Sequence, residues 1–177
     1  NVNKELQASQ WACNTMGITF DTIDMSSVGM FFREKQAKAK TGVFHVPIPH
    51  RNLVIASLAM SYAAQQKANE LCLGLNADDL EKPDYSTGTK HFFDQLVQMG
   101  HCLNLNVTAP LIQFTKPEII RMVSTWDGMD LTKTYSCMTG GEQHCGTCMQ
   151  CKSRYRSFKD AGVAEPENFY RNIPKFQ

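Results

Sequence analysis

Apolar residues recur at helical spacing in four stretches of the chain. The first stretch ends at Gly17, and glycine commonly follows the last turn of a helix. The second begins at Asn52 and is apolar nearly all round, which indicates a helix that packs on several sides. The last opens with Thr115 and Glu118, which have the spacing of a capping box. We therefore predict helices over residues 4–16, 52–70, 89–99 and 115–126.

Three shorter segments between these helices have strand-like patterns. Residues 18–25 follow the first helix, residues 71–75 form the continuous apolar run of a central parallel strand, and residues 103–108 alternate with period two. Helices that alternate with strands predict an α/β fold, a doubly wound parallel sheet covered by helices. Residues 26–50 look irregular and fit either a mobile loop over a site or a solvated connection.

Composition narrows the class of protein. A chain of 177 residues with 42% apolar and 20% charged residues suits one domain, residues 1–177. Eighteen basic against 17 acidic residues give a net charge of +1, so we expect neither nucleic-acid binding nor attraction to an anionic membrane. The longest apolar stretch, residues 53–64, is too short to cross a bilayer, and no signal segment opens the chain. The expected location is cytoplasmic.

The cysteines also favour a reducing compartment. Their number, seven, is odd, and three of them lie singly in segments predicted to be helix or strand. This distribution argues against a secreted disulfide scaffold. We expect these three to be small buried hydrophobic residues: Cys13, Cys72 and Cys102.

The other four cysteines fall within "SCMTGGEQHCGTCMQC", residues 136–151, with the spacing C-x7-C-x2-C-x2-C. The segment is rich in glycine and polar residues, so core packing does not explain them. Four thiolates complete a tetrahedral shell without an open position, which favours structural zinc. An iron–sulfur cluster and a disulfide pair remain alternatives, and His144 could replace one cysteine. The predicted ligands are Cys137, Cys145, Cys148 and Cys151.

The stretch "TYSCMTGGEQHCGTCMQCKSRYRSFKDAG" resembles the C-terminal end of the QueC family, the 7-cyano-7-deazaguanine (preQ0) synthases. The family pattern is T-x-S-C-Y-x-G-G-E-x-x-C-G-x-C-x-x-C-x-x-R, and Met138 replaces its tyrosine. Upstream, "IPHRNLVIASLAMSYAAQQKANELCLGLNADD" is similar to a V-P-G-R-N segment, a helix and a strand ending in G-x-x-x-x-D, with His50 in place of the glycine. "APLIQFTKPEII" is similar to T-P-L-x-x-x-x-K-x-E-I.

The resemblance implies a fold of the ATP pyrophosphatase type with a zinc-binding segment at residues 134–162. It also implies an ATP-dependent carbon–nitrogen ligase that converts 7-carboxy-7-deazaguanine and ammonia to preQ0. In the family's reaction the carboxylate is adenylated, ammonia displaces AMP to give an amide, and a second activation dehydrates the amide to the nitrile. ATP would act as a substrate together with Mg²⁺.

One family motif is absent. Members carry an S-G-G-x-D-S loop in a first strand-loop-helix unit, and residues 1–177 contain no such loop. Either this unit is missing from the sequence or the chain is a divergent relative that has lost ATP chemistry. We expect the first, because a sheet without its first strand would expose an edge.

The resemblance also implies site residues. Arg51 and Asn52 match its R-N pair, and Arg51 could clamp a carboxylate or phosphate or simply hold its loop. Asn76 and Asp79 follow a strand at the carboxyl edge of the sheet, where Asp79 could reach a metal or a purine-like base, or only cap a turn. Lys116 matches the family's lysine and could contact phosphate or face solvent. The predicted catalytic residues are Arg51, Asp79 and Lys116, with Asn52 and Asn76 binding substrate or nucleotide.

A second function class fits the same residues. A zinc-stabilised, non-catalytic QueC-like domain could serve as a binding or assembly module in a larger complex. Four basic residues near the C-terminus could then contact nucleic acid, although helix faces of this kind are usually only solvated: Lys152, Arg154, Arg156 and Lys159. For the enzyme we expect a small-molecule substrate and, as a candidate assembly, a homodimer.

Overall fold

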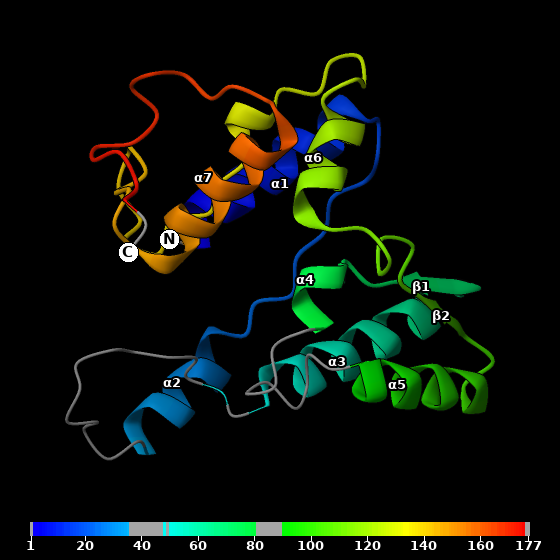
Figure 1. Cartoon of the computed structure of the whole chain (residues 1–177). Coiled ribbons are helices and arrows are strands. Elements are labelled where there is room, and N and C mark those ends of the chain that lie inside the picture. The colour runs from blue at the N-terminus through cyan, green and yellow to red at the C-terminus, as the bar shows by residue number, and fades with distance from the viewer. Residues whose placement is uncertain (1, 36–47, 49, 81–89, 176–177) are drawn as a thin grey trace. The chain divides into compact units, whose positions relative to one another are not determined.

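The computed structural model describes residues 2–35, 48, 50–80 and 90–175 (Figure 1). They form two compact units. One comprises Asn1–Asp21 with Thr115–Gln177, and the other comprises Thr22–Phe114. The single domain expected for residues 1–177 stays a prediction. Among the described helices, none combines the length and the apolarity needed to span a bilayer.

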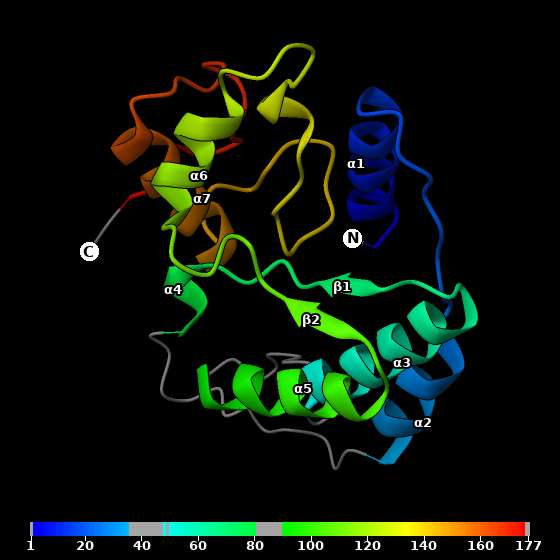
Figure 2. The ribbon, with the colours of Figure 1, turned by 90° about the vertical axis from the view of Figure 1, so that its right-hand side faces the viewer.

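The Thr22–Phe114 unit contains a small parallel sheet with helices packed on it. Strand β1 pairs with β2 in a register that places Leu71 opposite Val107. Helix α3 packs on β1 and α5 packs on β2, and Figure 2 shows both helices along one side of the strands. The elements in chain order are α2 (Ser26–Lys35), α3 (Arg51–Gln65), β1 (Glu70–Cys72), α4 (Ala77–Leu80), α5 (Lys90–Cys102) and β2 (Asn106–Thr108).

Apolar side chains between the two strands and helices α3 and α5 form the core of this unit. Met60 is the largest fully buried side chain there, and Leu96 and Val107 are also buried. The predicted apolar stripe of α5 is confirmed, because Phe92 and Phe93 pack against this core. The buried residues are Ala56, Met60, Ala63, Leu96, Leu105 and Val107.

The strand prediction for residues 71–75 is only partly correct. Strand β1 ends at Cys72, and Leu71 and Leu73 pack on the core while the side chains of Glu70 and Cys72 are exposed. The strand therefore has one buried face, as alternate side chains of a strand point to opposite sides of the sheet.

The predicted strand at residues 18–25 is wrong. This segment has no regular structure, and the helix α2 follows it within the region expected to be irregular. The carboxylate of Asp24 accepts hydrogen bonds from the backbone N–H and the hydroxyl of Ser26, at 2.8 and 2.6 Å. Such a local side-chain bond favours a turn and a helix start over an extended strand. Residues 36–47 and 49 of the predicted irregular region lie outside the described residues.

The α/β class is confirmed, with a sheet of two parallel strands in the described part of the chain. The doubly wound arrangement stays a prediction. The expected burial of the three single cysteines is wrong. Cys72 and Cys102 are exposed and Cys13 is half-buried.

The other unit is helical, with α6 packed against α7. The capping box predicted for Thr115 and Glu118 at the start of α6 is confirmed. The Glu118 carboxylate accepts hydrogen bonds from the backbone N–H and the hydroxyl of Thr115, both at 2.7 Å, and these bonds lower the pKa of Glu118. The elements are α1 (Val2–Thr15), α6 (Lys116–Val123), the short 3-10 helix η2 (Leu131–Lys133) and α7 (Met149–Ala161).

Replacing Gly100 with alanine is expected to destabilise the Thr22–Phe114 unit. An added Cβ would lie 2.5 Å from Cγ2 of Val107 and 2.6 Å from the carbonyl oxygen of Leu105, so α5 or β2 must shift. We expect a loss of about 1–3 kcal/mol in urea unfolding. Gly29→Ala in α2 is the matched control, because nothing lies within 4 Å of its added Cβ, and it should gain up to about 1 kcal/mol. Equal effects of the two substitutions would contradict this packing argument.

Candidate functional site

The four predicted ligands converge at one point. The sulfur atoms of Cys137, Cys145, Cys148 and Cys151 all lie within 4.8 Å of one another. The sulfurs of Cys145 and Cys151 are 3.9 Å apart, close to the roughly 3.8 Å edge of a tetrahedron of sulfurs around one zinc ion. This separation is far longer than an S–S bond of about 2.05 Å. Three of the four cysteines are buried, so the cluster fits a closed metal site.

Backbone N–H groups point at the sulfurs along the loop. The N–H of Cys145 donates to the sulfur of Cys137, and the N–H of Cys148 donates to that of Cys145, both at 3.3 Å. The N–H of Cys151 donates to the sulfur of Cys148 at 3.4 Å, so Cys148 also caps the N-terminus of α7. These donors and the helix end favour negative charge on sulfur.

The thiols are unequally prone to ionise. Burial by itself would raise the pKa of Cys145, but the hydroxyl of Thr147 and the N–H of Cys148 outweigh it and lower the pKa to about 5. Burial raises the pKa of Cys151 well above the usual value of a thiol. A bound cation would hold all four as thiolates, since metal ligation deprotonates cysteine outright.

The alternative in which His144 replaces one of the four cysteines is not supported. Its ring is buried, and its Nε2 accepts a hydrogen bond from the backbone N–H of Ser136 at 3.1 Å, which occupies the lone pair that a metal would need. Burial, together with the positive charge of Arg154, lowers the pKa of His144 to about 4. The imidazole is therefore neutral at physiological pH and serves the packing of the loop.

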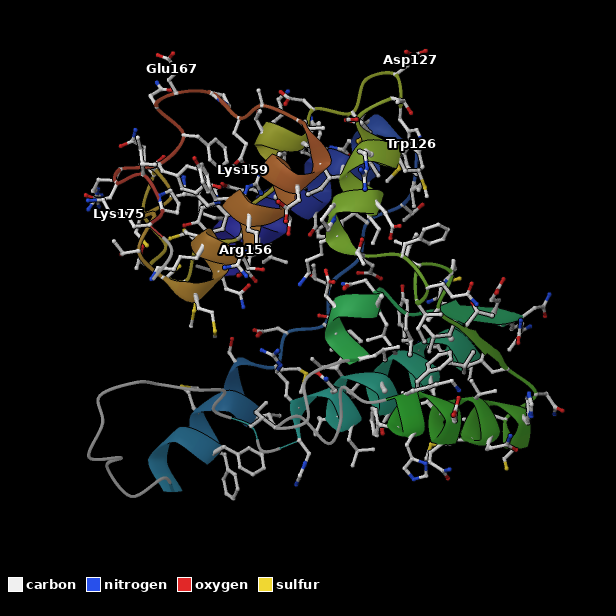
Figure 3. The ribbon with its side chains drawn as sticks, in the orientation of Figure 1. Trp126, Asp127, Arg156, Lys159, Glu167 and Lys175 are labelled. Atoms are coloured by element: carbon white, nitrogen blue, oxygen red, sulfur yellow. The ribbon has the colours of Figure 1, made fainter. Side chains whose placement is uncertain are left out.

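Arg154 was expected in a basic patch, and for this residue the prediction is wrong. Its side chain is buried and lies over the rings of Phe158 and Phe169, at 4.6 and 4.7 Å from its guanidinium carbon to the ring centroids. Arg156 and Lys159 of the same set project from α7 and are exposed (Figure 3). Arg154 is therefore not part of an exposed basic patch.

Arg51 is exposed and opens helix α3, and Asn52 follows it half-buried. The preceding residue, His50, has φ 49°, in the left-handed region that glycine adopts most easily. This backbone conformation gives a physical reason for the glycine that the resembling family has at this position.

Asn76 and Asp79 are in contact at the end of the segment that follows β1. The side-chain amide of Asn76 donates to the Asp79 carboxylate at 2.6 Å, and the N–H of Asp79 donates to the backbone carbonyl of Asn76 at 3.1 Å. Asp79 thus stabilises a local turn, as one reading of the sequence expected. The side-chain oxygen Oδ1 of Asn76 is buried, and no donor in the described residues reaches it.

Lys116 is the first residue of α6 and is half-buried. It belongs to the same unit as the four cysteines, whereas Arg51, Asn52, Asn76 and Asp79 belong to the Thr22–Phe114 unit. The structure therefore brings together two of the predicted sets, the four sulfurs and the Asn76–Asp79 pair. The roles assigned to the other residues stay predictions.

Fold and site define an α/β protein with parallel strands and, near its C-terminus, a mostly buried cluster of four cysteine sulfurs that could hold one metal ion. The family model described as "Queuosine biosynthesis protein QueC" matches residues 1–162. The chain therefore belongs to the QueC family, as the sequence resemblance predicted.

Several relatives carry the name "7-cyano-7-deazaguanine synthase". The chain is 29% identical to the one from Methanobrevibacter smithii, over 94% of this chain and 81% of the relative. It is 32% identical to "7-cyano-7-deazaguanine synthase 1" of Sulfurisphaera tokodaii, over 71% of this chain and 60% of the relative. It is 34% identical to that of Methanothermobacter thermautotrophicus, over 69% and 55%. The last two matches span less than two thirds of the relatives' length.

Cys148→Ser should reduce the metal content of the purified protein and destabilise the loop around residues 137–151. A serine oxygen is a poorer ligand than a thiolate, and this loop has little apolar surface of its own. The measurement is metal content by mass spectrometry, with thermal unfolding recorded in parallel. Cys102→Ser, at an exposed cysteine outside the cluster, is the control and should change neither. Unchanged metal content in Cys148→Ser would contradict the ligand assignment.

Proposed function

We propose that this protein makes 7-cyano-7-deazaguanine from 7-carboxy-7-deazaguanine and ammonia at the expense of ATP. The observation that carries the proposal is the family match over residues 1–162, together with relatives of that name aligned over 92–94% of the chain. The fold proposed for the whole protein is the ATP pyrophosphatase type, with a doubly wound parallel sheet. The small parallel sheet of the Thr22–Phe114 unit is compatible with it.

We propose zinc as the metal. The sulfurs lie close enough for all four to ligate one ion, whereas a cluster of several iron atoms needs its cysteine sulfurs spread more widely. Four protein thiolates leave no open coordination position, so the ion would stabilise the fold and take no part in the reaction. ATP and Mg²⁺ are proposed to bind away from it, because Mg²⁺ prefers oxygen ligands.

Asn76 and Asp79 are proposed to recognise the deazaguanine ring. A carboxylate can only accept hydrogen bonds, so the Asn76 group that faces Asp79 must be its NH₂, and the buried oxygen is the one left without a partner. Such buried acceptors are normally satisfied. An acceptor beside a carboxylate complements two adjacent donors.

A guanine-type ring has two such donors, the ring N1–H and the 2-amino group. An adenine ring instead presents a donor beside an acceptor on its equivalent edge. The pair therefore favours the deazaguanine substrate over the nucleotide as its ligand. Because Oδ1 of Asn76 is buried, binding would require a local opening of the turn.

Arg51 is proposed to neutralise the substrate carboxylate or a phosphate, since its guanidinium can make two parallel hydrogen bonds to either group. Asn52 and Lys116 are proposed as further polar contacts to substrate or nucleotide. The homodimer and the cytoplasmic location stay predictions, as does the expected lack of nucleic-acid binding.

Asp79→Ala should remove the preference for the 2-amino group of the substrate. With 7-carboxy-7-deazaguanine and its analogue without the 2-amino group as competing substrates, we expect the unsubstituted protein to favour the first. Losing a hydrogen bond to a charged acceptor costs about 1.5–3 kcal/mol, or roughly 10–100-fold in kcat/KM. Asp79→Ala should approach equal rates for both substrates, and Asp94→Ala, at an exposed carboxylate paired with Lys90, is the control.

The assay measures AMP and preQ0 formation by chromatography. It is run on residues 1–177 and on the same chain preceded by the first strand, loop and helix of a QueC relative, because residues 1–177 contain no S-G-G-x-D-S loop. A fusion that binds ATP and substrate without releasing AMP would contradict the enzyme and favour the non-catalytic module. An active fusion in which Asp79→Ala keeps its discrimination would contradict only the ring recognition.

Arg51→Ala should lower kcat/KM by roughly 10–100-fold in the active fusion, because one charge-assisted contact to carboxylate or phosphate would be lost. Lys90→Ala is the matched control, since its exposed ion pair with Asp94 contributes little to stability. Metal content and thermal unfolding should be unchanged in both variants. A full-rate Arg51→Ala fusion would remove this residue from the site.

A further inference from the structure

The chain beyond α7 folds back onto the loop that carries the cysteines. The N–H of Arg171 donates to the carbonyl of His144 at 2.8 Å, and the side-chain amide of Asn172 donates to the carbonyl of Cys145 at 3.1 Å. The side-chain amide of Gln143 donates to the carbonyl of Asn168 at 2.7 Å. Residues 163–172 lie after the end of the family match at residue 162.

The two segments approach too closely for a side chain at Gly146. A Cβ at this position would lie 1.6 Å from the carbonyl oxygen of Asn172, and the residue has φ 76°. Gly146 lies between two of the four ligands, Cys145 and Cys148. The backbone of residues 163–172 therefore packs directly against the loop at a position between two of the four cysteines.

Aromatic side chains fill the space between the same two segments. The ring of His144 stacks on Phe169, with 4.4 Å between ring centroids, and meets Tyr170 edge-on at 5.9 Å. Tyr170 belongs to the same buried cluster as Cys137, Cys145 and Cys151. Residues 163–172 thus help to bury Cys137, Cys145 and Cys151.

Arg154 connects two segments of the chain: the one that precedes the cysteine loop, here called the entering side, and the one that follows α7, here called the leaving side. On the entering side its guanidinium donates to the carbonyls of Leu131 and Thr134, at 2.9 and 3.1 Å, and to the Thr134 hydroxyl at 2.7 Å. On the leaving side it donates to the Glu165 carboxylate at 2.7 Å, whose other oxygen accepts from the hydroxyl of Tyr170 at 2.6 Å.

The ion pair between Arg154 and Glu165 is buried. Only 5% and 6% of their side-chain surfaces are exposed. A buried charge that loses its partner is strongly destabilising. Displacing the segment that carries Glu165 would therefore leave the buried charge of Arg154 unpaired and destabilise the fold around it.

We infer that residues 163–172 form the second half of the metal site, and that Arg154 is the positioning residue that holds the two halves together. Metal binding and closure of this segment are then linked, so each stabilises the other. This linkage rests on the zinc proposed above for the four cysteines and does not rest on the proposed enzymatic activity.

Arg154→Lys and Asn172→Ala test the first consequence, a loss of zinc affinity. Lysine keeps the charge but cannot reproduce the several directed hydrogen bonds of a guanidinium. Residues that support metal ligands typically change affinity by about 10–100-fold, which we expect for Arg154→Lys, with a smaller loss for Asn172→Ala. Zinc affinity is measured by competition with a chromogenic chelator on the 177-residue chain.

Each variant has a matched control. Arg156→Lys changes an exposed arginine of the same helix, and Asn168→Ala removes an exposed side chain while keeping the carbonyl that Gln143 contacts. The zinc affinity of both controls should stay within about twofold of that of the unsubstituted chain. This limit lies well below the loss of about 10–100-fold expected for supporting residues. If Arg154→Lys fails to fold, Asn172→Ala decides the test, because it removes a single hydrogen bond. Unchanged affinity in Asn172→Ala and in any folded Arg154→Lys would overturn the inference.

Hydrogen exchange tests the reverse direction. Removing zinc with a chelator should speed exchange of the Arg171 amide, whose bond to the His144 carbonyl depends on closure, more than exchange within α6 of the same unit. Equal protection of residues 163–172 with and without zinc would show that the segment closes independently of the metal and would contradict the linkage.

Discussion

Four cysteine sulfurs that lie close together and are mostly buried impose the constraint on which the packing of residues 115–177 depends. Four thiolates at these positions would repel one another and would lose their hydration on burial. Both effects oppose the folding of the loop, so other interactions must offset them. Backbone N–H groups and the N-terminus of α7 offset part of that cost, and a metal ion bound by the four sulfurs would offset the rest. The loop has little apolar surface of its own, so we expect a bound metal to contribute to its order together with the packing described above.

The packing around the loop follows from the same need to exclude water. His144 is kept neutral by burial, and it fills space between the loop and Phe169 instead of binding metal. Arg154 supplies the donors that the carbonyls of the entering chain require, and Glu165 neutralises its charge. Polar and ionic contacts therefore add to the aromatic packing that surrounds the four cysteines.

The Thr22–Phe114 unit is built on a different principle. Apolar side chains of α3, α5 and one face of the sheet form its core, and polar residues follow the strands. In α/β folds ligands bind outside the carboxyl ends of parallel strands, and Asn76 lies beyond that end of β1. A buried acceptor without a partner in the described residues is the physical mark of the proposed substrate contact.

The sequence by itself determined the four-cysteine cluster, the family and most of the helices. Cysteine spacing is a local property, and the helical pattern over residues 90–102 reflects one buried face, so both can be read along the chain. Strand limits were less predictable, because a strand exists only where a partner pairs with it. This explains why residues 18–25 have no strand and why β1 stops at Cys72.

Only the tertiary structure decided which polar residues are buried and what they contact. Arg154 and Arg156 look alike in the sequence, yet one is held in the interior by Glu165 and Thr134 and the other is exposed. The orphaned oxygen of Asn76 and the approach of Asn172 to Gly146 likewise depend on long-range packing. Burial and partners are set by residues distant in sequence, which no local pattern records.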